Sequence, residues 1–286
     1  MTQLAIVESG PLTTVQDLGR PGFAHIGVPS SGALDRGALR LANRLVGNSE
    51  ADAALEITVG GFEARATADV WVAVTGAWCP ITVEGEQVDP NTPVRVREGQ
   101  TLRVDAAAGG LRAYLGVRGG IESTPVLGSR SRDTLSGLGP EPLAAGDELA
   151  VGAVPDSPIP ALEIAPWSPP TLERVEMPVV LGPRREWFED AAVAAFFDTV
   201  WVLDAASDRV GARLVGDPVA RRIDAELPSE GMVAGAIQVP PSGLPTVLLA
   251  DHPVTGGYPV IAVVASEALD VFAQLRPGQE LAFRRA

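Results

Sequence analysis

The seven residues Glu98-Gly-Gln-Thr-Leu-Arg-Val104 recur in altered form twice further along the chain, as Ala145-Gly-Asp-Glu-Leu-Ala-Val151 and Pro277-Gly-Gln-Glu-Leu-Ala-Phe283. In each copy a glycine marks a tight turn, and apolar side chains then alternate with polar ones, as in a half-buried strand. The unit is too short to be the period of a solenoid, so we expect a turn–strand element that is reused in a barrel. The second and third copies end two stretches of similar size, which suggests two similar halves.

Short apolar runs continue this pattern through the rest of the chain. The 286 residues include 31 Gly and 25 Pro, and the apolar runs between them have the length of strands. Helical periodicity is confined to residues 34–46, 184–197 and 266–275. The sequence therefore predicts a mainly β protein with two barrel-like halves and a few short helices.

A proline-rich segment divides the chain. The segment Pro155–Pro178 contains seven prolines, counting both ends, and proline cannot donate to a strand ladder, so this segment is a poor central strand. We expect an N-terminal β domain over residues 1–155, a linker over 156–178 and a C-terminal barrel domain over 179–286.

The charge balance excludes several classes of function. The chain has 36 acidic and 22 basic residues, with a formal net charge of −14. A protein that binds nucleic acid needs a basic surface, so no nucleic-acid partner is expected, and anionic membranes are disfavoured for the same reason. All 22 basic residues are arginine. The absence of lysine excludes a Schiff base, a P-loop lysine and a Ser-Lys hydrolase.

Cysteine and histidine are scarce, with one Cys and two His in the chain. A closed zinc site needs four such ligands, so no zinc is expected, and a single cysteine fits a reducing cytoplasm. The first ten residues lack the features of a signal peptide, and the apolar stretches are too short to span a membrane. We expect a cytoplasmic protein with no metal site, in which Cys79 is a buried or half-buried, inert thiol.

Two Gly-Gly pairs with polar neighbours are candidates for anion binding. One follows Arg118 and precedes Ser129-Arg130, and the other lies in Thr255-Gly256-Gly257-Tyr258. Main-chain amides beside glycine can approach an anion closely, and arginine presents a planar fork to carboxylate or phosphate. The alternative is a turn or bulge that uses the positive φ available to glycine.

The stretch from Gln16 to His25 gathers carboxylate, guanidinium and imidazole groups, a mixture that suits an active-site loop. A capped loop that leads into the helix at 34–46 is the alternative. The chain has no G-x-S-x-G, H-E-x-x-H, C-x-x-C or Walker A motif. A Ser–His–Asp triad stays open, because triads are defined by geometry and not by order in the sequence.

Several motifs resemble those of a known family. They are Val15-Gln16-Asp17-Leu18-Gly19-Arg20-Pro21-Gly22, Val126-Leu127-Gly128-Ser129-Arg130-Ser131, Ser229-Glu230-Gly231-Met232-Val233 and Thr255-Gly256-Gly257-Tyr258-Pro259. Over essentially its whole length the chain resembles the allophanate hydrolase subunit 2 family, whose members are also called KipA-like or the C subunit of 5-oxoprolinase. The same module occurs in the carboxyltransferase region of urea carboxylases. The sequence departs from the family at Pro253-Val254, where Gln-Thr is common.

The resemblance implies a cyclophilin-like β-barrel architecture and a subunit of an ATP-dependent 5-oxoprolinase, which hydrolyses 5-oxo-L-proline to L-glutamate and whose single subunits are inactive alone. One implied partner is a KipI-like protein, the allophanate hydrolase subunit 1 or B subunit of 5-oxoprolinase, and another is a LamB/YcsF-type protein, its A subunit. ATP with Mg²⁺ would bind either this chain or a partner, and no covalent biotin is expected on this chain. Two alternatives remain: a carboxyltransferase or allophanate hydrolase subunit of urea or amide metabolism, which would use carboxybiotin on a carrier protein, and a KipA-like regulator without catalysis.

Within this resemblance we expect Asp17, Glu56 and Glu230 to take part in acid–base or metal-assisted catalysis. A structural role is an equally good interpretation of each. The expected substrate- or anion-binding residues are Gln16, Arg20, His25, Arg118, Ser129, Arg130, Gln238, Thr255, Gly256, Gly257 and Tyr258. We predict that Arg20, Arg118, Arg130 and Tyr258 converge in one cleft. The alternative is that each arginine forms an ion pair on the surface, worth less than ~1 kcal/mol.

Overall fold

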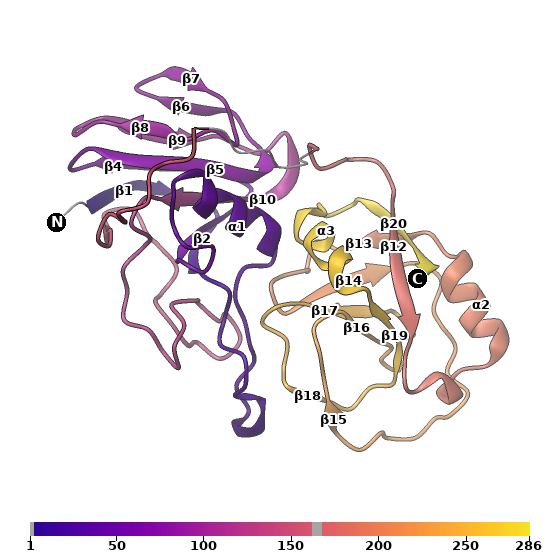
Figure 1. Ribbon diagram of the computed structural model, residues 1–286. Helices are drawn as coiled ribbons and strands as arrows, with labels where there is room; N and C mark the ends of the chain where they lie inside the picture. The colour runs from indigo at the N-terminus through magenta and orange to yellow at the C-terminus, as the bar shows by residue number, and fades with distance from the viewer. Residues whose placement is uncertain (1–2, 162–167) are drawn as a thin grey trace. The chain divides into compact units, whose positions relative to one another are not determined.

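The chain divides into two compact units (Figure 1). The computed structural model describes residues 3–161 and 168–286. The N-terminal unit comprises the chain up to Arg20, Ser31–Asp133 and Gly137–Pro170, and the C-terminal unit comprises Pro21–Ser30, Thr134–Ser136 and Thr171–Ala286. The division falls inside the predicted proline-rich linker, of which residues 162–167 lie outside the described part of the chain.

The linker ends earlier than the sequence suggests, because strand β12 (Val175–Leu181) begins before residue 179. Pro178 lies inside this strand, where it lacks a donor but still accepts a hydrogen bond from the amide of Ala265 at 2.9 Å. Residues 175–178 therefore belong to the C-terminal sheet and not to the linker.

Two antiparallel sheets form the N-terminal unit, for which the sequence predicts a barrel-like half. The first has the strand order β11-β1-β4-β9-β6-β7 and consists of β1 (Gln3–Ser9), β4 (Phe62–Ala66), β6 (Ile81–Val83), β7 (Glu86–Val88), β9 (Thr101–Val104) and β11 (Glu148–Ala150). The second has the order β2-β3-β10-β5-β8 and consists of β2 (Leu12–Gln16), β3 (Ala54–Thr58), β5 (Val70–Trp78), β8 (Val94–Val96) and β10 (Gly109–Val117). Buried side chains from both sheets form one core, which includes Leu4, Leu55, Phe62, Leu102 and Leu115.

Helix α1 (Arg36–Leu45) covers the second sheet. Asp35 caps it by accepting a hydrogen bond from the amide of Ala38 at 2.8 Å, which satisfies one of the free donors of the first turn. The buried side chains of Leu39 and Ala42 pack on the sheet beside Tyr114. The helix predicted over residues 34–46 is confirmed, and its apolar face accounts for its position.

The C-terminal unit contains a closed barrel with the strand order β12-β19-β16-β17-β14-β13-β20. The other six strands are β13 (Trp201–Leu203), β14 (Gly211–Val215), β16 (Ala236–Gln238), β17 (Thr246–Leu248), β19 (Val260–Val264) and β20 (Glu280–Arg285). Only the β12–β20 pair in this barrel is parallel. Phe196 stacks on Phe283 with ring centroids 4.7 Å apart, and the indole of Trp201 donates to the carbonyl of Phe196 at 3.1 Å.

Short helices and a small ribbon complete this unit. The predicted helix at 184–197 is divided into a 3₁₀ turn η2 (Arg185–Trp187) and α2 (Asp190–Asp198), and the one at 266–275 into η3 (Ser266–Ala268) and α3 (Leu269–Gln274). Ser266 is the first residue of η3 and makes no side-chain cap. Outside the barrel, β15 (Glu230–Gly231) pairs with β18 (Thr255–Gly256), and η1 (Ala24–Ile26) lies on the loop that follows Arg20.

The repeated turn–strand unit is confirmed at all three places, as β9, β11 and β20. In the three turns the glycines at 99, 146 and 278 have φ of 82°, 94° and 85°. The next amide in each turn donates to the carbonyl three residues before it, at 3.0 Å, 3.2 Å and 2.9 Å. A positive φ at the third position of such a turn is what glycine supplies without steric cost.

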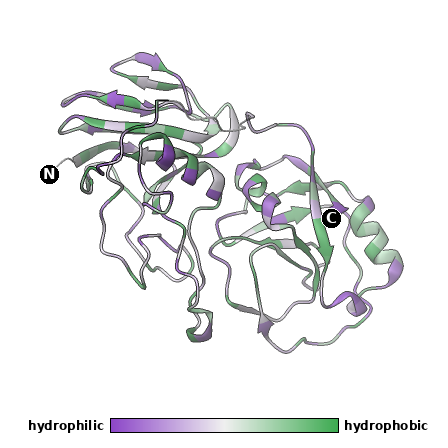
Figure 2. Ribbon diagram, viewed as in Figure 1, coloured by the Kyte–Doolittle hydropathy of each residue, from purple (hydrophilic) through white to green (hydrophobic). Residues whose placement is uncertain are grey.

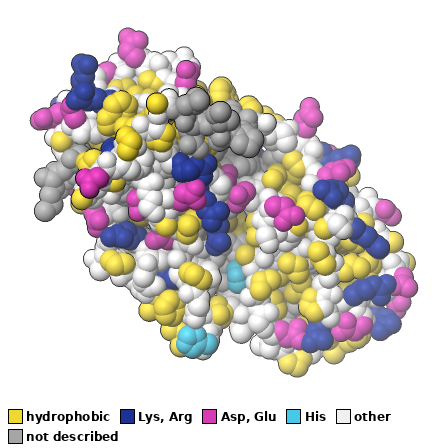
Figure 3. All heavy atoms as spheres, viewed as in Figure 1, with side chains coloured by type: hydrophobic (Ala, Val, Ile, Leu, Met, Phe, Trp, Pro, Cys, Tyr) yellow, Lys and Arg dark blue, Asp and Glu magenta, His cyan; other side chains and the backbone are white. Residues whose placement is uncertain are grey.

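Hydrophobic residues concentrate on the strands of both units, while the loops are more polar (Figure 2). Cys79 is buried in the N-terminal core with 3% of its surface exposed, so the prediction of a buried thiol is confirmed. On the face shown in Figure 3, acidic and basic side chains are interspersed. Among the described residues, no helix is long and apolar enough to cross a membrane.

Candidate functional site

The structure joins two of the predicted motifs of the N-terminal unit in what we call the Asp17 cluster: Gln16, Asp17, Ser129, Arg130 and Ser131. Asp17 follows the last residue of β2, and its Oδ1 accepts hydrogen bonds from the hydroxyls of Ser129 and Ser131, both at 2.6 Å, and from the amide of Gly19 at 2.7 Å. Its Oδ2 accepts from the amide of Arg130 at 2.6 Å. One carboxylate thus holds a segment more than a hundred residues away.

The hydrogen bonds of Asp17 define its role. A carboxylate offers about four lone-pair directions; here three donors converge on Oδ1 and one, the amide of Arg130, reaches Oδ2. The side chain is also 8% exposed. A general base needs a free lone pair that faces the substrate, so this geometry favours a structural role for Asp17, in which it fixes the conformation of residues 129–131.

Gln16 and Arg20 are buried beside the cluster. The amide nitrogen of the Gln16 side chain donates to the Thr14 hydroxyl at 3.0 Å and to the carbonyl of Arg132 at 2.9 Å. The guanidinium of Arg20, with 1% of the residue exposed, donates to the carbonyls of Val126 and Ser131. Both side chains therefore hold main-chain carbonyls in the interior.

Arg130 is the member of the Asp17 cluster whose side chain reaches the surface. Its guanidinium is 34% exposed and forms an ion pair with Glu122 at 3.0 Å, while its backbone is held by Asp17. Asp52 adds a second acidic group nearby: burial raises the pKa of the Asp52 carboxyl, and the amide of Ser49 and the charge of Arg130 oppose that rise. Arg130 is thus an oriented and accessible cation of the N-terminal unit.

Glu56 belongs to a different network, at the start of helix α1. Its Oε2 accepts from the amide of Leu34 at 3.0 Å and from the hydroxyl of Tyr114 at 2.7 Å, and it is 1% exposed. The Tyr114 hydroxyl in turn accepts from the amide of Asp35 at 2.8 Å. Burial, together with the charges of Glu56 and Asp35, raises the pKa of Tyr114 well above its ordinary value. These contacts fix the entry to the helix, which favours a structural role for Glu56.

Arg118 completes the frame at the other end of the same helix. It donates to the carbonyl of Val46, the C-cap residue of α1, at 2.6 Å. It also donates to the carbonyls of Pro155, at 3.0 Å, and Ser157. A cation at a helix C-terminus complements the helix dipole. The guanidinium expected to bind an anion therefore binds carbonyl oxygens of its own chain.

In the C-terminal unit, three neighbouring strands bring predicted residues to one end of the barrel, which we call the barrel rim. Leu181 of β12 pairs with Ala262 of β19, and Gln238 of β16 pairs with Val260 at the start of β19. Because both pairs are antiparallel, the residues after β12, those before β19 and the end of β16 lie at the same edge. These residues include Arg184, Tyr258 and Gln238.

An ion pair occupies the barrel rim. The guanidinium of Arg184, on the turn after β12, donates to both carboxylate oxygens of Glu230 in β15, with a 3.0 Å bond from Nε to Oε2. The hydrogen bonds from Arg184 lower the pKa of the Glu230 carboxyl, and those same bonds raise the pKa of the Arg184 guanidinium. The two side chains are 35% and 27% exposed. A carboxyl with a lowered pKa stays ionised near neutral pH, so Glu230 is unsuited to donate a proton there.

Gln238 ties the ribbon of β15 and β18 to the barrel. Its side-chain nitrogen lies 3.4 Å from the carbonyl of Tyr258 and 3.3 Å from Sδ of Met232. A Cβ at Gly256 would meet the Gln238 carboxamide, so a larger residue there would have to displace that side chain. Tyr258 itself, on the loop beside this close approach, has 46% of its surface exposed.

The remaining predicted residues are exposed positions of the C-terminal unit. His25 lies in η1, with its Nδ1 3.0 Å from the carbonyl of Gly22. Thr255 and Gly257 are exposed on either side of Gly256. They are accessible to a ligand, and no hydrogen bond of the described residues fixes the Thr255 hydroxyl.

Sequence reasoning missed a buried network in the C-terminal unit. Arg209 and Asp251 form a bidentate ion pair, with bonds of 2.9 Å and 3.1 Å and 1% and 0% exposure. The amide and hydroxyl of Thr134 donate to Asp251 as well, at 2.9 Å and 2.8 Å. Such a pair is costly to break, because removal of one partner leaves a buried charge. The sequence signal for this network was the Asp-Arg-Val-Gly run at 208–211, whose charged residues lie between the strands β13 and β14.

The convergence of Arg20, Arg118, Arg130 and Tyr258 in one cleft stays a prediction, and each residue is described within its own unit. Arg20 and Arg130 both contact the 129–131 segment or belong to it, whereas Arg118 binds elsewhere in the N-terminal unit. Tyr258 belongs to the C-terminal unit. Within the part of the chain that the structure describes, no group of three or more His, Cys, Asp and Glu side chains is arranged to hold a metal ion.

Comparison with known proteins shows the family of the chain. Residues 26–285 match the family model described as carboxyltransferase domain, subdomain A and B, and the chain belongs to this family. The C subunit of 5-oxoprolinase from Escherichia coli (strain K12) is 38% identical over 285 residues, which cover 98% of this chain and 90% of that protein. The Haemophilus influenzae protein of the same name is 32% identical, with 94% of this chain and 87% of that protein covered.

A solved structure supports the same assignment. The crystal structure of the Kluyveromyces lactis urea carboxylase superposes with a TM-score of 0.91 at 31% identity and covers 99% of this chain. This chain spans 27% of that protein, so only a portion of the urea carboxylase is comparable. The mainly β architecture inferred from the sequence is therefore that of the carboxyltransferase domain.

Proposed function

We propose that this chain is the C subunit of a 5-oxoprolinase, a hydrolase that opens the lactam ring of 5-oxo-L-proline to give L-glutamate. The observation that supports this best is the 38% identity to a protein of that name, because it extends over 98% of this chain and 90% of the relative. The names of the larger relatives, of which this chain covers only a small part, weigh less, because other domains of those proteins can supply their activity.

Ring opening breaks the carbon–nitrogen bond of a stable amide, and coupling to ATP would drive it. Phosphorylation of the amide oxygen would activate the ring carbon toward water. The nitrogen leaves with a proton, and a second water releases phosphate from the resulting acyl phosphate. The balance is one ATP and two waters in, and glutamate, ADP and phosphate out. This chain has no standard nucleotide motif, so ATP and Mg²⁺ would be held by arginines and Gly-rich loops of this chain or by a site on a partner.

The barrel rim offers the groups that a carboxylate substrate needs. Arg184 keeps about a third of its side chain exposed, while Glu230 holds two of its nitrogens and Glu186 lies 3.5 Å from the third. An oriented guanidinium loses little conformational entropy when it binds a carboxylate. Tyr258 and Thr255 add exposed hydroxyls from the neighbouring loop. We therefore propose that Arg184 binds the substrate carboxylate and that Glu230 positions it.

Arg130 is the candidate anion-binding arginine of the N-terminal unit, as Arg184 is of the C-terminal unit. The Asp17 cluster fixes its backbone, and Glu122 is its ion-pair partner at the surface. We propose that Arg130 contributes an anion contact, to phosphate or to substrate. Arg118, Glu56 and Gln16 then serve as the frame that supports this arrangement.

Reconstitution tests the proposal. The chain would be co-expressed with a KipI-like protein and a LamB/YcsF-type protein, and ATP-dependent release of glutamate from 5-oxo-L-proline measured. Arg184→Gln should lower the rate at least ~10-fold, equivalent to ~1.4 kcal/mol. Arg95→Gln is the matched control, because Arg95 is also an exposed arginine paired with a carboxylate, Asp69. Equal rates for the two variants would remove Arg184 from the site.

A carboxyltransferase subunit is the second candidate, favoured by the match to the urea carboxylase structure. That function requires a biotin carrier and a biotin carboxylase among the partners, whereas a 5-oxoprolinase requires neither. An assembled complex that turns over 5-oxo-L-proline without biotin would exclude it. The same turnover, if it depends on this chain, would exclude a regulator without catalysis. We further propose that the complex acts in the cytoplasm.

A further inference from the structure

Three polar side chains form a row on the outer face of the C-terminal barrel. Leu203 of β13 pairs with Leu214 of β14, and Arg213 of β14 pairs with Thr246 of β17. Successive residues of a strand point to opposite faces, and Leu203 and Leu214 are buried inside the barrel. Arg213 and Thr246 therefore point outward, and Asp204 follows Leu203 directly, beside them.

The opposite charges in this row do not neutralise each other. Oδ1 of Asp204 accepts a hydrogen bond from the amide of Ala206 at 2.7 Å, which closes the turn after β13. The guanidinium of Arg213 makes no hydrogen bond or ion pair with any residue that the structure describes. Arginine carries five donors and stays charged. The row thus presents an available cation beside a carboxylate whose second oxygen is also available.

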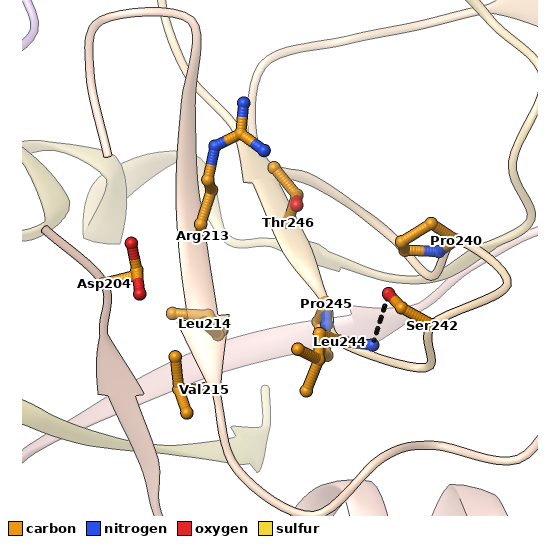
Figure 4. A pocket seen from close by; sticks show the side chains of 9 residues that line it. All are labelled: Asp204, Arg213, Leu214, Val215, Pro240, Ser242, Leu244, Pro245 and Thr246. Carbon is orange, nitrogen blue, oxygen red and sulfur yellow. Dashed lines mark hydrogen bonds between the residues drawn. The ribbon is translucent and has the colours of Figure 1, made fainter. Parts of the chain in front are cut away.

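A hollow of about 270 Å³ adjoins the row (Figure 4). The side chains of Arg213 and Thr246 lie next to each other at one end of it, and Val215 and Leu244 lie toward the other end. Val215 is 44% exposed although it is apolar. Pockets for drug-sized molecules begin at roughly 300 Å³, so this hollow suits a smaller ligand with a charged end and a short carbon skeleton.

We propose that this hollow binds a small carboxylate that carries an N–H donor beside its carboxyl group, as amino acids and lactam acids do. Arg213 and Thr246 would receive the carboxylate, since the guanidinium fork matches its two oxygens. The second oxygen of Asp204 would accept the N–H, and Val215 and Leu244 would contact the carbon skeleton. The hollow adjoins the barrel rim through the pairing of Thr246 with Gln238, but none of the rim residues Arg184, Gln238 and Tyr258 lines it. It does not depend on the proposed function.

The experiment titrates the purified full-length chain, without ATP or partners, and follows amide chemical shifts by NMR. The probes are L-glutamate, L-proline and 5-oxo-L-proline, with propionate as a carboxylate without N–H and 2-pyrrolidinone as a lactam without carboxylate. We expect saturable binding of at least one of the first three with Kd of about 1 mM, and shifts centred on residues 213, 215 and 246. Propionate and 2-pyrrolidinone should bind at least ~10-fold more weakly. Propionate lacks the N–H that would donate to Asp204, and 2-pyrrolidinone lacks the carboxylate that would accept from Arg213.

Two variants separate the contributions. Arg213→Met should weaken binding at least ~10-fold, whereas Arg95→Met, on the N-terminal unit, should leave it unchanged. Asp204→Asn retains an oxygen for Ala206 but presents a donor to the ligand, so it should weaken glutamate or proline and spare propionate. The proposal is overturned if no N–H carboxylate binds, if the shifts map away from the hollow, or if Arg213→Met binds as the wild type does in a chain with an unchanged NMR spectrum elsewhere. These results leave the hydrolase proposal untouched, because no turnover is measured.

Discussion

Replacement of Asp17 by asparagine distinguishes a structural carboxylate from a catalytic one. In the wild type, Asp17 accepts four hydrogen bonds from Gly19, Ser129, Arg130 and Ser131. The variant keeps an oxygen at the Oδ1 position, where three donors converge. At the Oδ2 position its NH₂ group faces the amide of Arg130, so two donors oppose each other in a buried site.

The magnitude follows from these contacts. A buried donor left without an acceptor costs about 1–3 kcal/mol, and each bond that loses its charged acceptor loses about 1 kcal/mol. One orphaned amide and three weakened bonds sum to about 5 kcal/mol, less what relaxation recovers, so we expect about 4 kcal/mol of destabilisation. A change of that size lowers the Tm of a unit of this length by roughly 10 °C.

Thermal unfolding followed together with hydrogen exchange is the assay, because the exchange rates assign the loss to the right unit. The amides of Gly19 and Arg130 should lose protection, while amides of the C-terminal barrel should keep theirs. Asp69→Asn is the control: Asp69 is an exposed acceptor for Arg95 and Glu98, and its loss should change stability by less than ~0.5 kcal/mol. If Asp17→Asn unfolds at the wild-type temperature yet abolishes turnover in an assembled complex, Asp17 is a catalytic group and our interpretation of the cluster is wrong.

Three further predictions concern assembly, titration and the lone thiol. Co-expression with a KipI-like protein should give one complex on size exclusion, with more than ~1,600 Å² buried, and two separately eluting proteins at micromolar concentration would contradict it. Arg184 lowers the pKa of Glu230, so Glu230 should titrate below its ordinary pKa of 4.5, and Arg184→Gln should return the pKa of Glu230 to that ordinary value. Any stability that this ion pair contributes is present above the ordinary pKa and is lost as the pH falls through the lowered pKa of the folded state. An unchanged Glu230 titration by NMR in Arg184→Gln would show that the ion pair does not persist in solution. Cys79→Ser places a hydroxyl in the core and should cost about 1–3 kcal/mol in unfolding measurements while leaving turnover; lost turnover at an unchanged Tm would identify a reactive thiol.

Local chemistry made the strands predictable. The three turn–strand units could be inferred because glycine at the third turn position and alternating apolar residues act locally, and all three became β9, β11 and β20. The helix at 34–46 was predictable for the same reason. The position where Pro178 enters β12 was not, because a proline is tolerated in a strand when its carbonyl still finds a donor, here Ala265.

The roles of polar residues depended on contacts distant in sequence. Arg118 beside a Gly-Gly pair has the composition of an anion site, but the carbonyls of Val46 and Pro155 already use its donors. Glu56 alternates with core residues of β3, so its direction away from the sheet core was predictable, while the amide of Leu34 that it meets was not. The joining of Asp17 to Ser129 and Ser131 was likewise a consequence of the fold. Both motifs were recognisable in the sequence, and only the structure showed that one fixes the other.

Glutamate release by the reconstituted complex shows whether this chain is a working part of a 5-oxoprolinase. The complete set of subunits with ATP and 5-oxo-L-proline should form glutamate, and omission of this chain should abolish it. Replacement of this chain by Arg184→Gln should lower the rate at least ~10-fold, and Arg95→Gln should leave it unchanged. A correctly assembled complex that forms no glutamate, or that forms it equally well without this chain, would contradict the account.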